Sequence, residues 1–299
     1  MTLQHERAES RAGWMFVTPV LVLIGVFFVI PVLGALVLSF TDFDIYSIGN
    51  PADTRFIGLG NYRSLFTDPL FWKALRNTAY YVVVGGPLSV VVSLAAALLV
   101  NARLIHWKPL FRSAFFAPWV TTLVAVALVW RYLYHPQYGL LNASLGLVGV
   151  GPIDWLGNPR WAMPAIILMS VWKNFGYNML IFLAGLQTIP PQLYEAAELD
   201  GAGRWQRFRQ VTVPMLGPTF VFVGVVTMIA AFQIFSEPYV MTQGGPLKST
   251  LTLVLFMYEQ GFRWWRLGFA AAVAVVLGLL TLAGTAVQLR LRRGGERVV

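Results

Sequence analysis

Residues 14–40 read WMFVTPVLVLIGVFFVIPVLGALVLSF, a run of 27 residues without a charged side chain. A helix that crosses the hydrocarbon layer of a bilayer needs about 20 such residues, because that layer is about 30 Å thick and each residue rises 1.5 Å. A cleaved secretory signal is shorter and ends at small residues, so we interpret this stretch as a retained span. It predicts a membrane protein.

Five further runs of the 299-residue chain are long and apolar enough to cross a membrane, and overall 57% of the residues are hydrophobic and 12% charged. A soluble domain has about 25% charged residues. Barrel strands are shorter and alternate strictly, so helices fit better. The predicted fold is therefore all-α, a polytopic membrane protein with six transmembrane helices. The five further runs are 74–100, 113–134, 161–186, 216–239 and 267–289. Helix breakers inside the spans predict kinks at Pro31, Gly85, Gly86, Pro87, Pro118 and Pro164.

The distribution of basic residues predicts the orientation. With both termini in the cytoplasm, twelve Lys and Arg side chains fall inside, nine fall outside and Lys173 lies within a span. The net charge of +9 then reflects membrane topology instead of nucleic-acid binding. Tryptophans near span ends fit the same layout. The expected organisation is a cytoplasmic tail 1–13, a six-helix transmembrane domain 14–289 that includes the loop 189–214, and a basic cytoplasmic tail 290–299.

Between the fourth and fifth spans, residues 189–214 read IPPQLYEAAELDGAGRWQRFRQVTVP. Proline suits a first helical turn, and glycines at 201 and 203 supply a stop and a turn, so the segment predicts helix, sharp turn, helix. Glu195 and Glu198 are expected near the N-terminus of the first helix, where the helix dipole favours acids. The apolar stripe of that helix either docks into a groove of a partner or lies on the membrane surface.

The same segment carries a family resemblance. Glu195-Ala196-Ala197, then Gly201, then Pro214 resemble the EAA loop of ABC-importer permeases. FIGLGNY at 56–62, AGLQ at 184–187 and YVMTQGGP at 239–246 resemble the carbohydrate-uptake branch, the maltose- and glycerol-phosphate-type permeases. The resemblance covers nearly the whole chain.

The resemblance implies one permease subunit of a bacterial inner-membrane importer for a sugar or sugar-like solute. Its partners would be a second, unlike permease, two cytoplasmic ATPases and an extracytoplasmic solute-binding protein. The chain has no phosphate-binding loop, so we expect ATP and Mg²⁺ to be bound by the ATPases and this subunit to be neither an enzyme nor a holder of cofactors. The residues expected to couple it to the ATPase are Glu195, Ala196, Ala197, Asp200, Gly201, Arg204 and Pro214.

Polar side chains inside predicted spans are costly and therefore candidates for function. On the fourth span, Asn174 and Asn178 share a helix face with Tyr177 beside them, and this face could line a cavity. Thr227 falls where the resemblance puts a sugar contact. The expected substrate-binding residues are Asn174, Tyr177, Asn178, Thr227, Gln233 and Glu237. The alternatives are that these groups join helices by hydrogen bonds and that Lys173 extends to the membrane surface.

Two outer loops are expected near the binding protein. Gln243-Gly244-Gly245-Pro246 has the composition of a turn, and the resemblance places it on the periplasmic side. The acidic segment 41–73 either contributes to the same dock or is simply solvated. His5, His106 and His135 are too scattered to predict a metal site.

Two other classes of function remain as alternatives. A secondary transporter driven by an ion gradient would also have polar groups at mid-membrane, but it would need no EAA loop. An intramembrane enzyme would need paired carboxylates, a zinc motif or a serine elbow, and none is found. The sequence leaves open which solute is carried.

Overall fold

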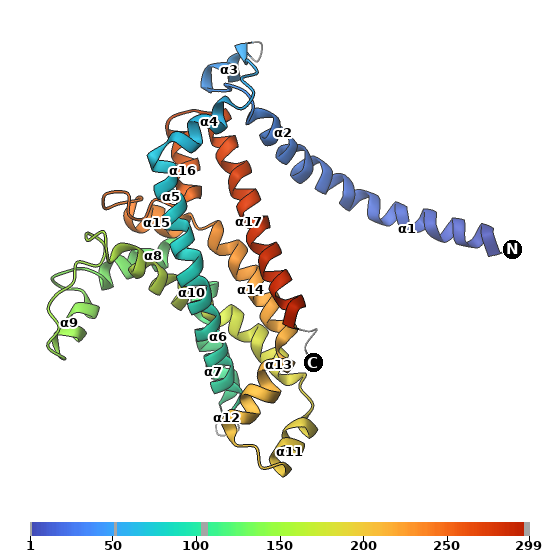
Figure 1. Cartoon of the computed structure of the whole chain (residues 1–299), viewed down its shortest axis with the longest axis vertical. Coiled ribbons are helices and arrows are strands. Elements are labelled where there is room, and N and C mark those ends of the chain that lie inside the picture. Colours follow the sequence, from blue (N-terminus) through green and yellow to red (C-terminus); the bar gives the residue numbers. More distant parts are fainter. Residues whose placement is uncertain (1, 51–52, 103–106, 296–299) are drawn as a thin grey trace. The chain divides into compact units, whose positions relative to one another are not determined.

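The computed structural model describes residues 2–50, 53–102 and 107–295, and over these residues the chain is helical (Figure 1). The only β pairing among them is an isolated antiparallel bridge between Thr41 and Phe56. This confirms the predicted all-α class. In chain order the helices are α1 (Thr2–Ile24), α2 (Ile30–Leu38), α3 (Ile45–Gly49), α4 (Gly60–Thr67), α5 (Pro69–Tyr80), α6 (Gly86–Asn101), α7 (Lys108–Val120), α8 (Leu123–Leu133), α9 (Leu140–Gly146), α10 (Ala162–Gln187), α11 (Pro191–Leu199), α12 (Arg204–Arg207), α13 (Val213–Met215), α14 (Gly217–Phe232), α15 (Ser236–Thr242), α16 (Leu253–Tyr258) and α17 (Leu267–Gly295).

Four helical stretches are long and apolar enough to span a membrane, and two bent pairs bring the number to six if each pair is one span. The four are Gly13–Leu38, Pro69–Asn101, Ala162–Gln187 and Leu267–Arg290. Two of them contain short π-helical turns, Gly25–Val29 before Pro31 and Tyr81–Gly85 before Gly86. Such turns disturb the regular ladder of hydrogen bonds at the glycines and prolines that predicted kinks.

The third and fifth spans are not the continuous helices that the sequence predicts. Lys108–Val120 and Leu123–Leu133 meet at 96°, because residues 121 and 122 adopt extended backbone angles directly after Pro118. At the fifth span, the 67° bend between Arg204–Met215 and Gly217–Phe232 lies at residue 216, where the predicted span begins. The helix that follows the bend ends at Phe232 and not at residue 239, because the chain leaves the helical conformation before α15 begins at Ser236; Phe235 has a φ of −137°.

Pro164 was expected to kink the fourth span, and this expectation is wrong. The residue lies in the first turn of α10, where the missing N–H has no helical partner in any case. α10 is a single α-helix of 26 residues, without a break between Ala162 and Gln187.

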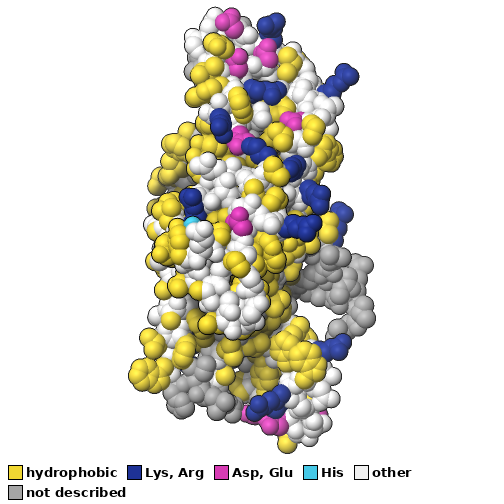
Figure 2. Space-filling view, turned by 90° about the vertical axis from the view of Figure 1, so that its left-hand side faces the viewer, with side chains coloured by type: hydrophobic (Ala, Val, Ile, Leu, Met, Phe, Trp, Pro, Cys, Tyr) yellow, Lys and Arg dark blue, Asp and Glu magenta, His cyan; other side chains and the backbone are white. Residues whose placement is uncertain are grey.

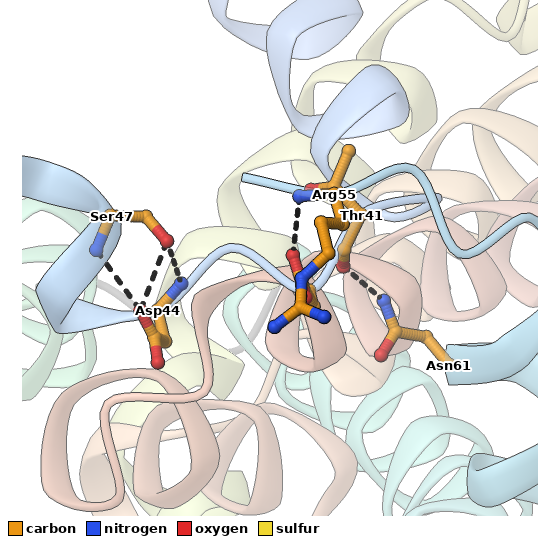
Figure 3. Close-up of polar contacts among 6 residues, drawn as sticks. Thr41, Asp44, Ser47, Arg55 and Asn61 are labelled. Atoms are coloured by element: carbon orange, nitrogen blue, oxygen red, sulfur yellow. Dashed lines mark hydrogen bonds and ion pairs between the residues drawn. The ribbon is translucent and has the colours of Figure 1, made fainter. Parts of the chain in front are cut away.

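Contacts divide the chain into two units. The first comprises Met1–Asp68 and Met257–Val276, and its polar contacts gather after the first span (Figure 3). The side-chain amide of Asn61 donates to the carbonyl oxygens of Ser39 (2.9 Å) and Thr41 (2.7 Å), while Asp42 accepts from the Arg55 backbone N–H at 2.7 Å. The FIGLGNY stretch thus ties down the chain where the first span ends.

The second unit comprises Pro69–Phe256 and Leu277–Val299, and α10 packs there against α6 and α7. Two apolar clusters form along α10. One includes Met163, Ile166 and Met169, and the other includes Met179 and Phe182. The polar positions 174, 177 and 178 fall between the buried members of the two clusters, so one face in the middle of α10 is polar.

The described surface is rich in large apolar side chains, and Figure 2 shows hydrophobic groups over much of one face. In the first span, for example, Phe16 is 78% and Phe27 75% exposed. Exposure of this extent is expected for side chains that face lipid or another membrane subunit.

Candidate functional site

A cavity of about 450 Å³ lies beside the middle of α10. Its wall comes from the π-helical turn Tyr81–Gly85 with the start of α6, the end of α7, the start of α8, the middle of α10, the end of α14 and the start of α15. We refer to it as the α10 cavity. All six residues that the sequence predicts to bind substrate line it: Asn174, Tyr177, Asn178, Thr227, Gln233 and Glu237.

The hydrogen bonds divide these six residues into two groups. The amide of Asn178 donates to the hydroxyl of Thr227 at 3.1 Å and joins α10 to α14, which is the helix-joining role weighed as an alternative. The amide of Asn174 donates to the carbonyl of Ser170 one turn earlier in the same helix, at 2.9 Å. Among the described residues, no hydrogen bond joins the side chain of Gln233 or the hydroxyl of Tyr177 to another protein group, so these two groups are available to a bound molecule.

The cavity also has an aromatic wall. The rings of Trp119 and Tyr177 stack with centroids 5.0 Å apart and an interplanar angle of 15°, and both line the cavity. Aromatic faces beside hydrogen-bonding groups suit ligands that have both apolar and hydroxyl surfaces. Sequence reasoning asked for an aromatic face but did not find Trp119. The sequence signal that could have identified Trp119 is its position directly after Pro118, close to the break in the third span.

Lys173 does not extend to the membrane surface, so that alternative is wrong. Its side chain is buried, 6% exposed, and its ammonium donates to the carbonyl oxygens of Pro118, Trp119 and Thr121 at 3.3, 3.2 and 3.0 Å. These carbonyls belong to the end of α7, which lies next to α10. A nearby set of acceptors therefore offers the ammonium an alternative to water.

Residues 189–214 form a helix, a turn and a further helical stretch. We refer to them as the 189–214 segment. α11 ends at Leu199, the Gly201 N–H donates to Glu198 O at 3.1 Å, and the Ala202 N–H donates to Ala197 O at 2.9 Å. Gly201 has a φ of +76°, the left-handed conformation that closes such a C-terminal motif. Asp200 caps α11 and Arg204 begins α12, while Pro214 lies in α13.

The acids of this segment do not lie where the helix dipole predicts. α11 starts at Pro191 and has no acid in its first turn, so neither Glu195 nor Glu198 is explained by the N-terminal dipole. Glu198 lies near the C-terminal end and forms an ion pair with Arg207 of α12, with 3.0 Å between nitrogen and oxygen. Ion pairing with the returning chain offsets an unfavourable position beside the helix carbonyls.

Large apolar side chains of the 189–214 segment remain exposed. Leu199 is 90% and Trp205 70% exposed, and Glu195 and Ala196 are exposed beside them. Tyr194 and Thr212 share a hydrogen bond of 3.0 Å, which ties α11 to the returning chain. The segment is thus held by its own contacts and presents apolar groups outward.

The loop after α15 is braced from α5. The side-chain amide of Asn77 donates to the carbonyls of Lys248 (3.0 Å) and Leu251 (2.9 Å), and the Lys73 ammonium donates to the Leu247 carbonyl. Gln243 and Gly244 have positive φ angles of 51° and 81°. The QGGP stretch is therefore part of a defined turn, as its composition predicts.

Some predicted features lie outside the described residues. Arg103, His106 and Arg297 are not described, nor are the side chains of His5, Arg7 and Arg11. Within the described part, no group of three or more His, Cys, Asp or Glu side chains is placed to hold a metal ion.

Comparison with known proteins gives a family match over residues 12–294, to the binding-protein-dependent transport system inner membrane component. The Lactose transport system permease protein LacF of Rhizobium radiobacter is 39% identical over 273 residues, covering 90% of this chain and 89% of that protein. The Trehalose/maltose transport system permease protein MalF of Thermococcus litoralis is 32% identical, covering 98% and 97%.

A solved structure has the same fold. It is that of a bacterial alginate ABC transporter in complex with an alginate pentasaccharide-bound periplasmic protein. One of its chains superposes with a TM-score of 0.79 at 20% identity, covering 96% of both chains. The likeness shows a shared fold over nearly the whole length of both chains.

Proposed function

Because the chain belongs to the family of binding-protein-dependent transport system inner membrane components, we propose that it forms the translocation pathway of an importer for a neutral or weakly charged sugar. The chain is a multi-pass permease subunit of an ABC importer, and the family consists of permeases and not of enzymes. Family membership also favours this function over a carrier driven by an ion gradient. Two curated relatives are named for lactose and for trehalose/maltose, which supports a sugar as cargo.

The observation that carries the cargo proposal is the composition of the α10 cavity. It combines an aromatic stack of Trp119 and Tyr177 with the polar side chains of Gln233 and Glu237. A sugar presents apolar C–H faces and a rim of hydroxyl groups, and the two kinds of wall match these surfaces. Asn174, Asn178 and Thr227 complete the polar rim.

We infer that the 189–214 segment couples this subunit to a partner ATPase on the cytoplasmic side. Its exposed apolar groups need a partner surface, and the glycine turn at Gly201 fixes the angle between α11 and the returning chain. The segment continues through α13 toward α14, which lines the cavity. A rigid displacement at Glu195, Ala196 and Ala197 would therefore be passed along the chain to the cavity wall.

The remaining partners follow from the family and the relatives. An extracytoplasmic binding protein delivers the solute, a second and unlike permease completes the pathway, and the ATPases bind ATP and Mg²⁺. The name of the family, and the periplasmic protein bound in the alginate transporter structure, support the first of these. Both termini then lie in the cytoplasm, in agreement with the excess of basic residues on that side.

The cargo proposal is tested in the assembled importer, reconstituted with its binding protein and offered a panel of sugars. Stimulated ATP hydrolysis identifies the cargo. Gln233→Ala and Tyr177→Phe should then raise the apparent KM about tenfold, as expected for the loss of one or two hydrogen bonds in a buried site. Gln137→Ala, an exposed glutamine outside the cavity, is the matched control. Unchanged apparent affinity in Gln233→Ala, Tyr177→Phe and Asn174→Ala together would refute the site.

The coupling proposal is tested by cross-linking. The chain has no native cysteine, so Ala197→Cys provides a single reactive site. It should cross-link to an ATPase subunit in the working complex, whereas Ser144→Cys on α9 should not. Transport that proceeds while Ala197→Cys never captures an ATPase would contradict the docking role.

A further inference from the structure

Lys173 is a buried cation at a broken helix. It lies in the middle of α10, is 6% exposed, and donates hydrogen bonds to three carbonyl oxygens at the end of α7. A buried ammonium without compensation is very costly, and its three N–H groups can satisfy three acceptors. The number of donors therefore matches the number of carbonyls that face it.

The break in the span explains why these carbonyls need donors. The Pro118 carbonyl also accepts from the Thr121 hydroxyl at 2.6 Å, whereas Lys173 is the donor to those of Trp119 and Thr121. α7 ends at Val120 and the chain turns through 96° into α8, so the last carbonyls of α7 have no helical N–H donors. In water such groups would be solvated, but in a membrane-spanning segment they are not. A cation at a helix C-terminus also meets the negative end of the helix dipole. Lys173 satisfies both requirements from the neighbouring helix.

The helices approach each other closely at this point. A side chain at Gly176, almost one turn after Lys173, would place its Cβ in collision with the backbone carbonyl oxygen of Phe115. Gly176 thus allows α10 to lie against the backbone of α7, and Lys173 reaches the carbonyls that follow.

The corner supplies part of the cavity wall. Lys173 bonds the carbonyl of Trp119, whose ring stacks on Tyr177 and lines the cavity, and Leu123 on the other side of the break lines it too. Lys173 itself does not line the cavity. Its effect on a bound molecule therefore passes through the position of the corner.

We propose that Lys173 is a positioning residue: it caps the C-terminus of α7 from within the membrane and holds the α7–α8 corner, with Trp119, against the α10 cavity. This role concerns the cavity wall whatever the cargo is, so it stands apart from the identity of the transported sugar. Arginine at this position would keep the charge and the donors, whereas methionine would keep only the length of the side chain.

The test uses the absence of native cysteine. Leu123→Cys, placed at the corner, is allowed to react with the small thiol reagent 2-aminoethyl methanethiosulfonate in the assembled importer. Lys173→Met should raise the reaction rate at least about fivefold, because the carbonyls of Trp119 and Thr121 lose the ammonium donor and the corner loosens. Lys173→Arg should stay within about twofold of the parent.

A control separates the corner from general loosening of α10. Ile166→Val removes one methylene from the fully buried Ile166 of the same helix and should leave the rate at Leu123→Cys unchanged. If Lys173→Met does not assemble, Lys173→Gln, which keeps two donors without a charge, replaces it and should react at least about twice as fast as Lys173→Arg.

Three results would overturn the proposal. They are a parental rate in Lys173→Met or its Gln substitute, an increase in Lys173→Arg as large as in the uncharged variant, and an equal increase in Ile166→Val. The first would show that the corner needs no cap, the second that the cationic donors do not matter, and the third that any loss of packing on α10 has the same effect.

Discussion

The α10 cavity and the 189–214 segment arrange side chains in opposite ways. Around the cavity, Lys173 and Asn178 are buried polar groups in an apolar surrounding, with 6% and 5% exposure. In the 189–214 segment, Leu199 and Trp205 are apolar groups on the surface, with 90% and 70% exposure. Each arrangement is costly for an isolated chain, the first by desolvation and the second by exposed apolar area.

The difference teaches what each region needs from outside. The cavity already satisfies Lys173 and Asn178 internally, so only a few groups such as Gln233 remain for a ligand. The 189–214 segment satisfies its backbone and its ion pair internally but leaves apolar area that only another protein can cover. A small polar molecule suits the first region and a protein groove suits the second.

The largest expected effect concerns the turn of the 189–214 segment. Gly201→Val should leave the chain inserted and assembled but abolish sugar-stimulated ATP hydrolysis, because a β-branched residue is strongly disfavoured at a φ of +76°. ATP hydrolysis by the complete importer, with and without sugar-loaded binding protein, measures this effect.

Gly203→Ala is the matched control for this turn. Gly203 has an ordinary φ of −68°, and an added Cβ would meet only the Gln206 side chain, at 3.8 Å. It should keep nearly normal coupling. Normal stimulation in Gly201→Val would show that the geometry of the turn does not transmit the motion.

The next effect concerns the exposed apolar surface. Leu199→Glu should lower the amount of ATPase that copurifies with the permease about tenfold, because a charge would be buried in the partner's groove. The melting temperature of the isolated permease should not change, since Leu199 is 90% exposed in it.

Leu147→Glu controls for the introduced charge. Leu147 is 89% exposed, just after α9, and lies outside the 189–214 segment. It should copurify normal amounts of ATPase. Equal losses in the two variants would remove the argument that the exposed apolar groups of the segment form a specific dock.

Much of this comparison was readable from the sequence. The apolar runs predict the spans, and Asn174, Tyr177 and Asn178 are predicted to share a face because helical periodicity is a local property. The helix–turn–helix of the 189–214 segment was also predicted from its glycines and prolines. In the structure, Gly201 has the left-handed backbone conformation that favours glycine.

The features that the sequence did not predict depend on contacts between distant residues. Lys173 meets carbonyls more than 50 positions away, and Trp119 meets Tyr177 across the same helix pair. Glu198 pairs with Arg207 only because the turn brings α12 back beside α11. The periodicity of a single sequence carries no signal for contacts between residues that are far apart along the chain. From the sequence, the break after Pro118 cannot be told from an ordinary kink.

A smaller effect concerns the hydrogen bond between α10 and α14. A double-mutant cycle with Asn178→Leu and Thr227→Val should give a coupling free energy of about 1 kcal/mol, the magnitude expected of a hydrogen bond between membrane helices. Unfolding of the purified permease in mixed micelles measures it. A value near zero would instead leave both groups free for the cargo and enlarge the polar part of the cavity.

The control cycle pairs Asn178→Leu with Ser93→Ala. Ser93 is fully buried, but its hydroxyl donates to the Ser89 carbonyl of its own helix. The coupling between these two positions should be zero within error. A coupling as large as that of the first cycle would mean that the variants perturb the helix packing as a whole.

The smallest effect concerns the hydrogen bonds to Asp44 at the start of α3, which belong neither to the α10 cavity nor to the 189–214 segment. The Ser47 backbone N–H, followed by its hydroxyl and the Tyr46 N–H, donates to the Asp44 carboxylate, which lowers the pKa of Asp44 below its ordinary value (Figure 3). Because the pKa of Asp44 is lower in the folded state, the cap stabilises α3 fully above the unfolded pKa of about 4. This stabilisation is lost as the pH falls through the folded-state pKa.

Exchange of the Tyr46 and Ser47 amides should accelerate in this acidic range, relative to Asp44→Asn, which keeps a capping oxygen but does not titrate. Global unfolding should be unaffected, because this carboxylate is in contact with water, unlike the buried ammonium of Lys173. The same pH dependence in both proteins would show that the cap contributes nothing.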